Sequence, residues 1–197
     1  MGESEFTATK RPELWRDRLE AAFDVGLARI REGHLRVTAG HNMTGDWCDG
    51  KPPANVWVLA SAETAQAYWD RQPALLDIPA KVKGFSIEPL LERFNLDLRH
   101  GCRGCNHPGN IVMHWNEAGR CSTCDGTGHE PSGVDWVIVG GESGPDRRDC
   151  GVDAIVNVAE ECVAAGVPVF VKQASAFRAG AQGGIPGSIW ARKEFPR

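Results

Sequence analysis

Short apolar runs that alternate with helix-like segments restrict the fold of this 197-residue chain more than any other feature. Each run has five or six residues and is rich in apolar side chains, which is typical of strands that are buried on both faces. The predicted strands are residues 56–60, 82–87, 135–139 and 167–171. The predicted helices are residues 12–33, 62–72 and 151–165. Strands alternating with helices indicate βα units with right-handed crossovers, so the sequence predicts an α/β fold with a mainly parallel sheet.

The ends of two predicted helices have recognisable signals. Ser61 is a suitable N-cap for the helix over 62–72, and Pro73 is expected to interrupt that helix. Apolar residues spaced by three and four run along 151–165, and Gly166 follows as a C-terminal signal. This apolar stripe consists of Val152, Ile155, Val156, Ala159, Cys162 and Val163. The residues from Arg178 onward are rich in glycine and are predicted to be an irregular surface segment.

Polar residues follow each predicted strand. In parallel α/β sheets ligands bind at the carboxyl ends of the strands, so these residues are the candidates for a ligand site. The candidates from this argument are Ser61, Glu63, Ser86, Glu88, Gly140, Gly141, Glu142, Ser143, Lys172 and Gln173. A lysine at the end of an apolar strand is either paired or directed into a pocket, and Glu88 and Glu142 are its natural partners. An internal ion pair without a ligand and a ligand site remain equally open.

Two CxxC pairs lie between the second and third predicted strands. Cys102-x-x-Cys105 and Cys121-x-x-Cys124 are separated by fifteen residues, a spacing typical of four thiolates around one structural zinc ion. Two redox-active CxxC motifs are the alternative, and one of the nearby histidines could replace a cysteine ligand. Residues 99–131 are therefore predicted to be a zinc-ribbon-like insertion within a single domain over 1–197.

Charge gives little support for nucleic-acid binding. The chain has 22 Lys and Arg against 26 Asp and Glu, a formal net charge of −4. The predicted insertion has three arginines and three acidic residues, which is a poor basis for binding phosphates. No apolar run reaches the 18 or so residues of a membrane span, and the first residues lack a signal-peptide pattern. We therefore expect a cytoplasmic protein that does not bind membranes.

Several ordered segments resemble the phage and prophage family of uncharacterised radical-SAM-like proteins. The segments are Thr9 to Glu13, Asn55 to Trp57 with Ser61 and Glu63, Ser86 to Leu91, Asp135 to Pro145 with Arg148, and Cys162 with Ala165 to Gln173. The resemblance implies a (βα) barrel, a ligand pocket that also includes Lys10 and Arg11, and S-adenosylmethionine as a ligand. It also implies the host cytoplasm as the location if the chain is phage-encoded.

The chain departs from this family in one important respect. None of its seven cysteines matches the cluster motif that the family carries before the Thr-Lys-Arg-Pro segment, so we expect zinc but no iron–sulfur cluster. Its length is also below the roughly 250 residues typical of an eight-stranded barrel. The resemblance thus implies the C-terminal part of a barrel, which is not expected to act alone as a radical SAM enzyme.

A partial barrel has an open sheet edge that needs a cover. A separately encoded N-terminal half, a second copy of the chain, or the chain's own residues before 54 could supply it. Two other hypotheses remain: a non-enzymatic zinc-containing module that binds a protein, or less readily nucleic acid, and a truncated product without function of its own.

Overall fold

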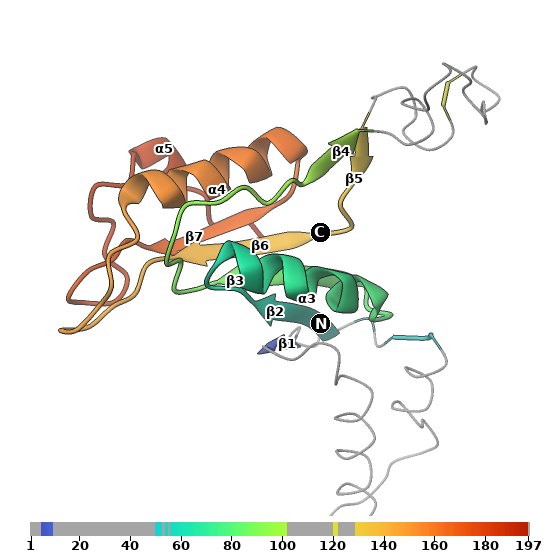
Figure 1. Cartoon of the computed structure of the whole chain (residues 1–197), viewed down its shortest axis with the longest axis horizontal. Coiled ribbons are helices and arrows are strands. Elements are labelled where there is room, and N and C mark those ends of the chain that lie inside the picture. Colours follow the sequence, from blue (N-terminus) through green and yellow to red (C-terminus); the bar gives the residue numbers. More distant parts are fainter. Residues whose placement is uncertain are drawn as a thin grey trace, which may run out of the picture.

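The core of the fold is one parallel β-sheet. The structure is a computed structural model that describes residues 5–9, 50–52, 54, 56–101, 120–121 and 129–196. Its strands, in their order across the sheet, are β1 (Glu5–Thr9), β2 (Val56–Ser61), β3 (Val82–Ile87), β6 (Trp136–Gly140) and β7 (Val169–Gln173). Every neighbouring pair is parallel, which confirms the predicted α/β fold with a parallel sheet (Figure 1).

The boundaries of the predicted strands agree with β2, β3 and β6 to within one residue and differ by more at β7, whereas β1 was not predicted. The predicted strand over 82–87 is β3, whereas β7 begins at Val169, two residues later than predicted. Gly166 and Val167, the two residues before Pro168, cap the end of the preceding helix, because the Val167 amide donates to the Cys162 carbonyl at 2.9 Å. Helix capping therefore uses the start of the apolar run that the sequence assigned to the strand.

Helix α3 (Ala65–Asp77) begins and ends later than predicted. Ser61 belongs to β2, and Thr64 is the N-cap, whose hydroxyl accepts a hydrogen bond from the Ala67 amide at 3.3 Å. Pro73 lies inside the helix and does not end it, so that expectation was wrong. Leu75, in the helical turn after Pro73, is completely buried. Its packing stabilises the helix past Pro73, where local propensity alone would end it.

Helix α4 (Val152–Ala165) is the most accurately predicted helix. It ends at Gly166, which adopts the left-handed conformation with φ of 71° and is the predicted C-terminal signal. Its buried stripe consists of Ala154, Ile155, Val158, Ala159 and Cys162. Val163 is 42% exposed, contrary to the prediction, because it lies in the last turn and borders a surface hollow instead of the sheet.

The two faces of the sheet differ in what they pack against. On one face, here called the helix face, Phe85, Ile87, Val137 and Val139 form one cluster with buried residues of α3 and α4. Figure 1 shows these two helices beside the sheet, along β3 and β7. The other face, here called the aromatic face, has a cluster built from strand residues alone. It comprises Leu59, Val82, Trp136 and Ile138, with Trp57 and Phe170 packed against them.

The C-terminal segment is more regular than predicted. It includes the short helix α5 (Gly187–Trp190), and its continuation runs along the outer edge of β7. The Val171 amide donates to the Arg192 carbonyl at 2.9 Å, and the Glu194 amide donates to the Val169 carbonyl at 3.1 Å. Residues 187–196, here called the strap, therefore extend the sheet by an antiparallel contact at Lys193.

A small two-stranded sheet lies at the ends of the predicted insertion. Strand β4 (Arg99–Gly101) pairs antiparallel with β5 (His129–Pro131), so residues 99 and 131 are neighbours (Figure 1). The proposed zinc ligands Cys102, Cys105 and Cys124 lie outside the described residues, and Cys121 is buried. The predicted helix over 12–33, with Lys10 and Arg11 before it, also lies outside them. Among the described residues, no helix has the length and apolar character needed to span a membrane.

Candidate functional site

Lys172 and Glu88 meet at the carboxyl ends of the strands. Lys172 lies near the end of β7 and Glu88 directly follows β3, 84 residues earlier in the chain. The Lys172 ammonium is 3.2 Å from the Glu88 Oε2 atom. Lys172 is therefore paired, and Glu88 is its partner among the two carboxylates that the sequence suggested. Because parallel strands end at one edge, residues far apart in sequence are brought together here.

The Glu88 carboxylate is held in a mostly buried position. Its side chain is 17% exposed, and Oε2 also accepts a hydrogen bond from the Ser86 hydroxyl at 3.4 Å. The other oxygen, Oε1, is buried and has no hydrogen-bond partner among the described residues. Gly140 makes this position available, because a Cβ atom there would lie 2.8 Å from Oε1. A buried carboxylate oxygen without a partner costs free energy and is a feature that often marks functional sites.

Glu142 pairs with Arg148 instead of Lys172. The Arg148 Nε atom donates to Glu142 Oε2 at 2.8 Å, and Nη2 donates to Oε1 at 3.0 Å. The Arg148 amide adds a third hydrogen bond, to Oε2 at 2.8 Å. These hydrogen bonds from Arg148 lower the pKa of Glu142 to about 2. In the sequence, Arg148 was noted only as part of the segment that resembles the phage family. It follows Glu142 by six residues, and this short spacing is the signal that could have predicted the ion pair across the loop.

Glu63 belongs to the same edge but has a structural partner. Its carboxylate is 3.3 Å from the Arg71 guanidinium, and its backbone carbonyl accepts a hydrogen bond from the Leu91 amide at 3.0 Å. The pKa of Arg148 is raised by the hydrogen-bonded Glu142 carboxylate and, to a lesser extent, by the charge of Glu63. Glu63 therefore contributes to the electrostatics of the edge, and its ion pair with Arg71 fixes the start of α3.

A small pocket opens between these residues. It has a volume of about 230 Å³, and its lining includes Glu88, Gly141, Glu142, Ser143 and Lys172. Gln173 forms its floor, since its side-chain amide donates to the Gly141 carbonyl at 2.8 Å and is buried. Gly141 is needed for this packing, because a Cβ atom there would lie 2.4 Å from the Ser175 amide nitrogen. This strand-end pocket thus gathers most of the site residues that the sequence suggested.

A larger cavity adjoins the strand-end pocket on the aromatic face. Its volume is about 540 Å³, and it also has Ser86, Glu88 and Lys172 in its lining. The strap supplies its outer wall through Trp190, Lys193 and Phe195. The sequence did not predict this cavity, since the residues from Arg178 onward were expected to be irregular. The volume of this cavity lies within the usual range of ligand pockets, whereas the volume of the strand-end pocket is below that range.

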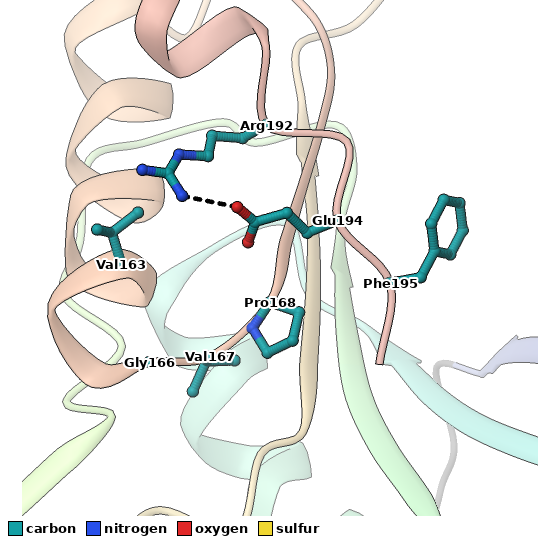
Figure 2. Close-up of a pocket in the computed structure, with 7 residues that line it drawn as sticks. All are labelled: Val163, Gly166, Val167, Pro168, Arg192, Glu194 and Phe195. Atoms are coloured by element: carbon teal, nitrogen blue, oxygen red, sulfur yellow. Dashed lines mark hydrogen bonds and ion pairs between the residues drawn. The ribbon is translucent and has the colours of Figure 1, made fainter. Parts of the chain in front are cut away.

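A third hollow lies at the opposite end of β7. It has a volume of about 670 Å³ and lies between the end of α4 and the strap (Figure 2). An ion pair of 2.6 Å joins Arg192 and Glu194 across it. In Figure 2 this pair lies beside α4, while Phe195 points away from it. Since ligands of parallel sheets bind at the carboxyl ends, this amino-end hollow is not part of the candidate site.

The remaining described cysteines show no arrangement for metal binding. Cys162 is fully buried in α4, as predicted, and burial raises its pKa. Burial also raises the pKa of Cys150, whose sulfur lies 3.7 Å from the Ser175 hydroxyl. Within the described ranges, no three residues of the His, Cys, Asp and Glu types are grouped in a way that could hold a metal ion. The predicted zinc site falls mostly outside those ranges.

Comparison with known proteins gives one family. The profile of a family described as "Protein of unknown function (DUF5131)" matches residues 5–187, which include every strand of the parallel sheet. No match was found among curated proteins, and none among solved structures.

Proposed function

Because the chain belongs to the DUF5131 family, whose function is unknown, we propose a function from its site: it binds the amino-acid group of a small ligand at the carboxyl ends of the strands. The observation that carries this proposal is the Glu88–Lys172 pair beside the strand-end pocket, with one Glu88 carboxylate oxygen that has no partner in the part of the chain that the structure describes. A carboxylate and an ammonium side by side complement the ammonium and carboxylate of an α-amino acid.

A part of a (βα) barrel is the architecture that we propose for this site. Two observations support it: the parallel strands follow their order in the chain, and helices α3 and α4 pack against one face. In a barrel the helices lie outside, and the other face lines the interior. On that reading the aromatic face is the barrel interior, and Glu88 and Lys172 lie at its mouth.

S-adenosylmethionine is the ligand that the family resemblance suggests. Its methionine part has the ammonium and carboxylate that the pair would bind, and the volume of about 230 Å³ suits such a group. The sequence resembles phage radical-SAM-like proteins without their cluster cysteines, so the proposal assigns binding, and no radical reaction, to this chain alone. Glu142 is held by Arg148 and would shape the pocket instead of binding the ligand directly.

The test of this proposal is titration calorimetry with S-adenosylmethionine and with methionine. Lys172→Gln should weaken binding about tenfold or more, because a charge-assisted contact to the carboxylate is lost. Lys81→Gln removes the same charge from an exposed position before β3 and should leave binding unchanged. Equal affinity of the wild type and Lys172→Gln, or the absence of binding by the wild type, would contradict the proposal.

A structural zinc ion bound by Cys102, Cys105, Cys121 and Cys124 is a second part of the proposal. Two observations support it: the pairing of β4 with β5 brings the ends of the segment together, and Cys121 is buried. Elemental analysis should find about one zinc and no iron per chain. Iron in stoichiometric amount, or Cys121→Ser protein that retains all of its zinc, would contradict the assignment.

A partner that completes the sheet would have to bind at β1. Residues of the strap already pair with the outer edge of β7, whereas β1 is the last strand at the other end of the sheet order. A separately encoded N-terminal half or a second copy of the chain is therefore proposed to add its strand beside β1. Cross-linking from cysteines introduced at Thr7 should capture such a partner, and cross-linking from Lys193 should not.

The alternative function is a zinc-containing module that binds a protein partner and has no ligand. The observation in its favour is that β4 and β5 form a separate sheet that projects from the main one (Figure 1). Replacing residues 102–128 by a short linker distinguishes the two functions. Ligand binding by the shortened chain supports the strand-end site. A full-length chain that binds no ligand, and that loses its partner when shortened, supports the module.

A further inference from the structure

The side chains of the strap point alternately to two sides. Residues 192–194 are extended along β7, so successive side chains point to opposite sides. Arg192 and Glu194 face the end of α4, where they form their ion pair (Figure 2). Lys193 and Phe195 face the aromatic face, where the Phe195 ring lies 5.3 Å from the Trp136 ring. The strap thereby forms the outer wall of the cavity of about 540 Å³.

Four of the ten described residues that line this cavity are aromatic. Trp136 and Phe170 come from adjacent strands, and Trp190 and Phe195 come from the strap. The rings of Phe170 and Phe195 are 5.5 Å apart at an angle of 61°, an edge-to-face arrangement. Aromatic walls of this kind favour a flat ring as the occupant, since ring faces and edges attract each other in offset and edge-to-face contacts.

The charged groups in the wall give it one excess positive charge. Lys172 and Glu88 neutralise each other at the end near the strand-end pocket. The Lys193 ammonium lies 3.6 Å from the centre of the Trp190 ring and 5.2 Å from that of Phe170, and it donates a hydrogen bond to the Val171 carbonyl. Burial lowers the pKa of this ammonium, so an anion placed beside it would restore some of the solvation that it has lost.

We propose that the cavity between the aromatic face and the strap is a binding site for an aromatic anion, with the ring against Trp136, Phe170 and Trp190 and the anionic group at Lys193. The site goes beyond the amino-acid site at the strand ends, since neither Lys193 nor Trp190 lines that pocket. A carboxylate and a phosphate share the required chemistry. A neutral ring would leave Lys193 without a partner from the ligand, and a cation would be repelled by it.

The volume of the cavity is consistent with this ligand class. Small-molecule sites usually measure about 300–1,000 Å³, are mostly apolar, and have a few polar groups that fix the orientation of the ligand. The cavity of about 540 Å³ combines apolar walls with Lys193 at one end and the Glu88–Lys172 pair at the other. A single-ring or two-ring acid would fit, with the ring in the middle and its acid group at the strap.

The test uses a matched pair of probes, 1-naphthaleneacetate and the neutral 1-naphthaleneacetamide, with the full chain. Both have the same two-ring body, so titration calorimetry isolates the effect of the charge. The anion should bind the wild type about tenfold more tightly than the amide, and Lys193→Gln should remove this difference. Trp190→Ala should weaken both probes by a similar factor of about five or more, because it removes part of the ring wall.

Lys81→Gln is the control for charge, and circular dichroism verifies that each variant is folded. Equal binding of the two probes by the wild type, or an unchanged preference in Lys193→Gln, would overturn the proposal. A third variant, Ile138→Phe, fills the cavity and should block both probes, and full binding by this variant would also overturn it. Failure of the proposed amino-acid site has a different result. In that case Lys172→Gln does not change the binding of S-adenosylmethionine, while Lys193→Gln still removes the preference for the anionic naphthalene probe.

Discussion

The two faces of the sheet show how one element serves two purposes. On the helix face Phe85 is fully buried in a cluster of residues from the strands, α3 and α4, and its ring centre lies 4.4 Å from that of Tyr68 in α3. On the aromatic face Phe170 is only partly buried, and its neighbours include Lys193 and the exposed ring of Phe195. Close packing on the first face stabilises the fold, while the second face retains a cavity and charges. The difference assigns close packing to one side of the sheet, and our proposal places ligand binding on the other.

The largest predicted effect comes from equal truncations on the two faces. Phe85→Ala should reduce the free energy of unfolding by about 3–5 kcal/mol, because it leaves a cavity in a closed core. Phe170→Ala should cost less than about 2 kcal/mol, because part of its ring is in contact with the cavity and with solvent. Urea denaturation of both variants measures the difference. Equal losses would mean that the two faces contribute alike, which would remove the contrast between them.

Two adjacent glycines at the strand ends sharpen the comparison further. Gly141→Ala should destabilise the fold by about 1–3 kcal/mol, because its Cβ would meet the backbone of Ser175. Gly140→Ala should change stability less, because its Cβ meets the flexible end of Glu88, yet it should displace that carboxylate and weaken ligand binding. Thermal unfolding and calorimetry measure the two effects.

Gly184→Ala is the control for this pair of substitutions. A Cβ atom there would lie 3.6 Å from the nearest side-chain atom of Val152, an ordinary contact, so both stability and binding should be unchanged. A Gly140→Ala variant with wild-type affinity would show that the position of Glu88 does not matter for the ligand.

The smallest predicted effect is the pH dependence of the Glu142–Arg148 pair, which is exposed and belongs to neither face. Arg148 lowers the pKa of Glu142 from 4.5 to about 2, so the folded state favours the carboxylate. Its stabilisation is fully present above about pH 4.5 and is lost as the pH falls toward about 2. The difference in stability between the wild type and Glu142→Gln should therefore shrink over this interval.

Unfolding curves recorded from pH 6 to pH 2 measure this change. Glu160→Gln, at an exposed position of α4, is the control for the loss of one carboxylate elsewhere on the surface. A Glu142→Gln difference that stayed constant through pH 3 would show that Arg148 does not stabilise the charged form.

Strands β2, β3, β6 and β7 and the helix over 152–165 were predicted because their signals are local, whereas β1 (Glu5–Thr9) was not predicted. Apolar runs of strand length mark β3 and β6, and Gly166 marks the end of α4. The extent of α3 was not predictable, because Pro73 is a local signal to stop and the burial of Leu75 is a tertiary effect. Likewise the glycines after Arg178 indicate loops. Residues 192–194 are extended because they pair with the edge of β7, which is a tertiary contact.

The candidate site divides in the same way. The rule that ligands meet the carboxyl ends of parallel strands was sufficient to select Glu88, Glu142 and Lys172 from the sequence. It could not decide which carboxylate faces Lys172, since both follow strands next to or near β7 in the sheet. That choice depends on the short loop that returns Arg148 to Glu142 and leaves Glu88 for Lys172.

The sequence by itself determined the parallel α/β sheet, the polar edge of its strands and the helix that ends at Gly166, because periodicity, composition and glycine conformation act over a few residues. Only the tertiary structure decided the pairing of Glu88 with Lys172, the Glu88 oxygen that has no partner among the described residues, and the cavity bordered by the strap. Each of these joins residues that are distant in the chain, so its energy depends on which surfaces meet, and no local pattern encodes that meeting.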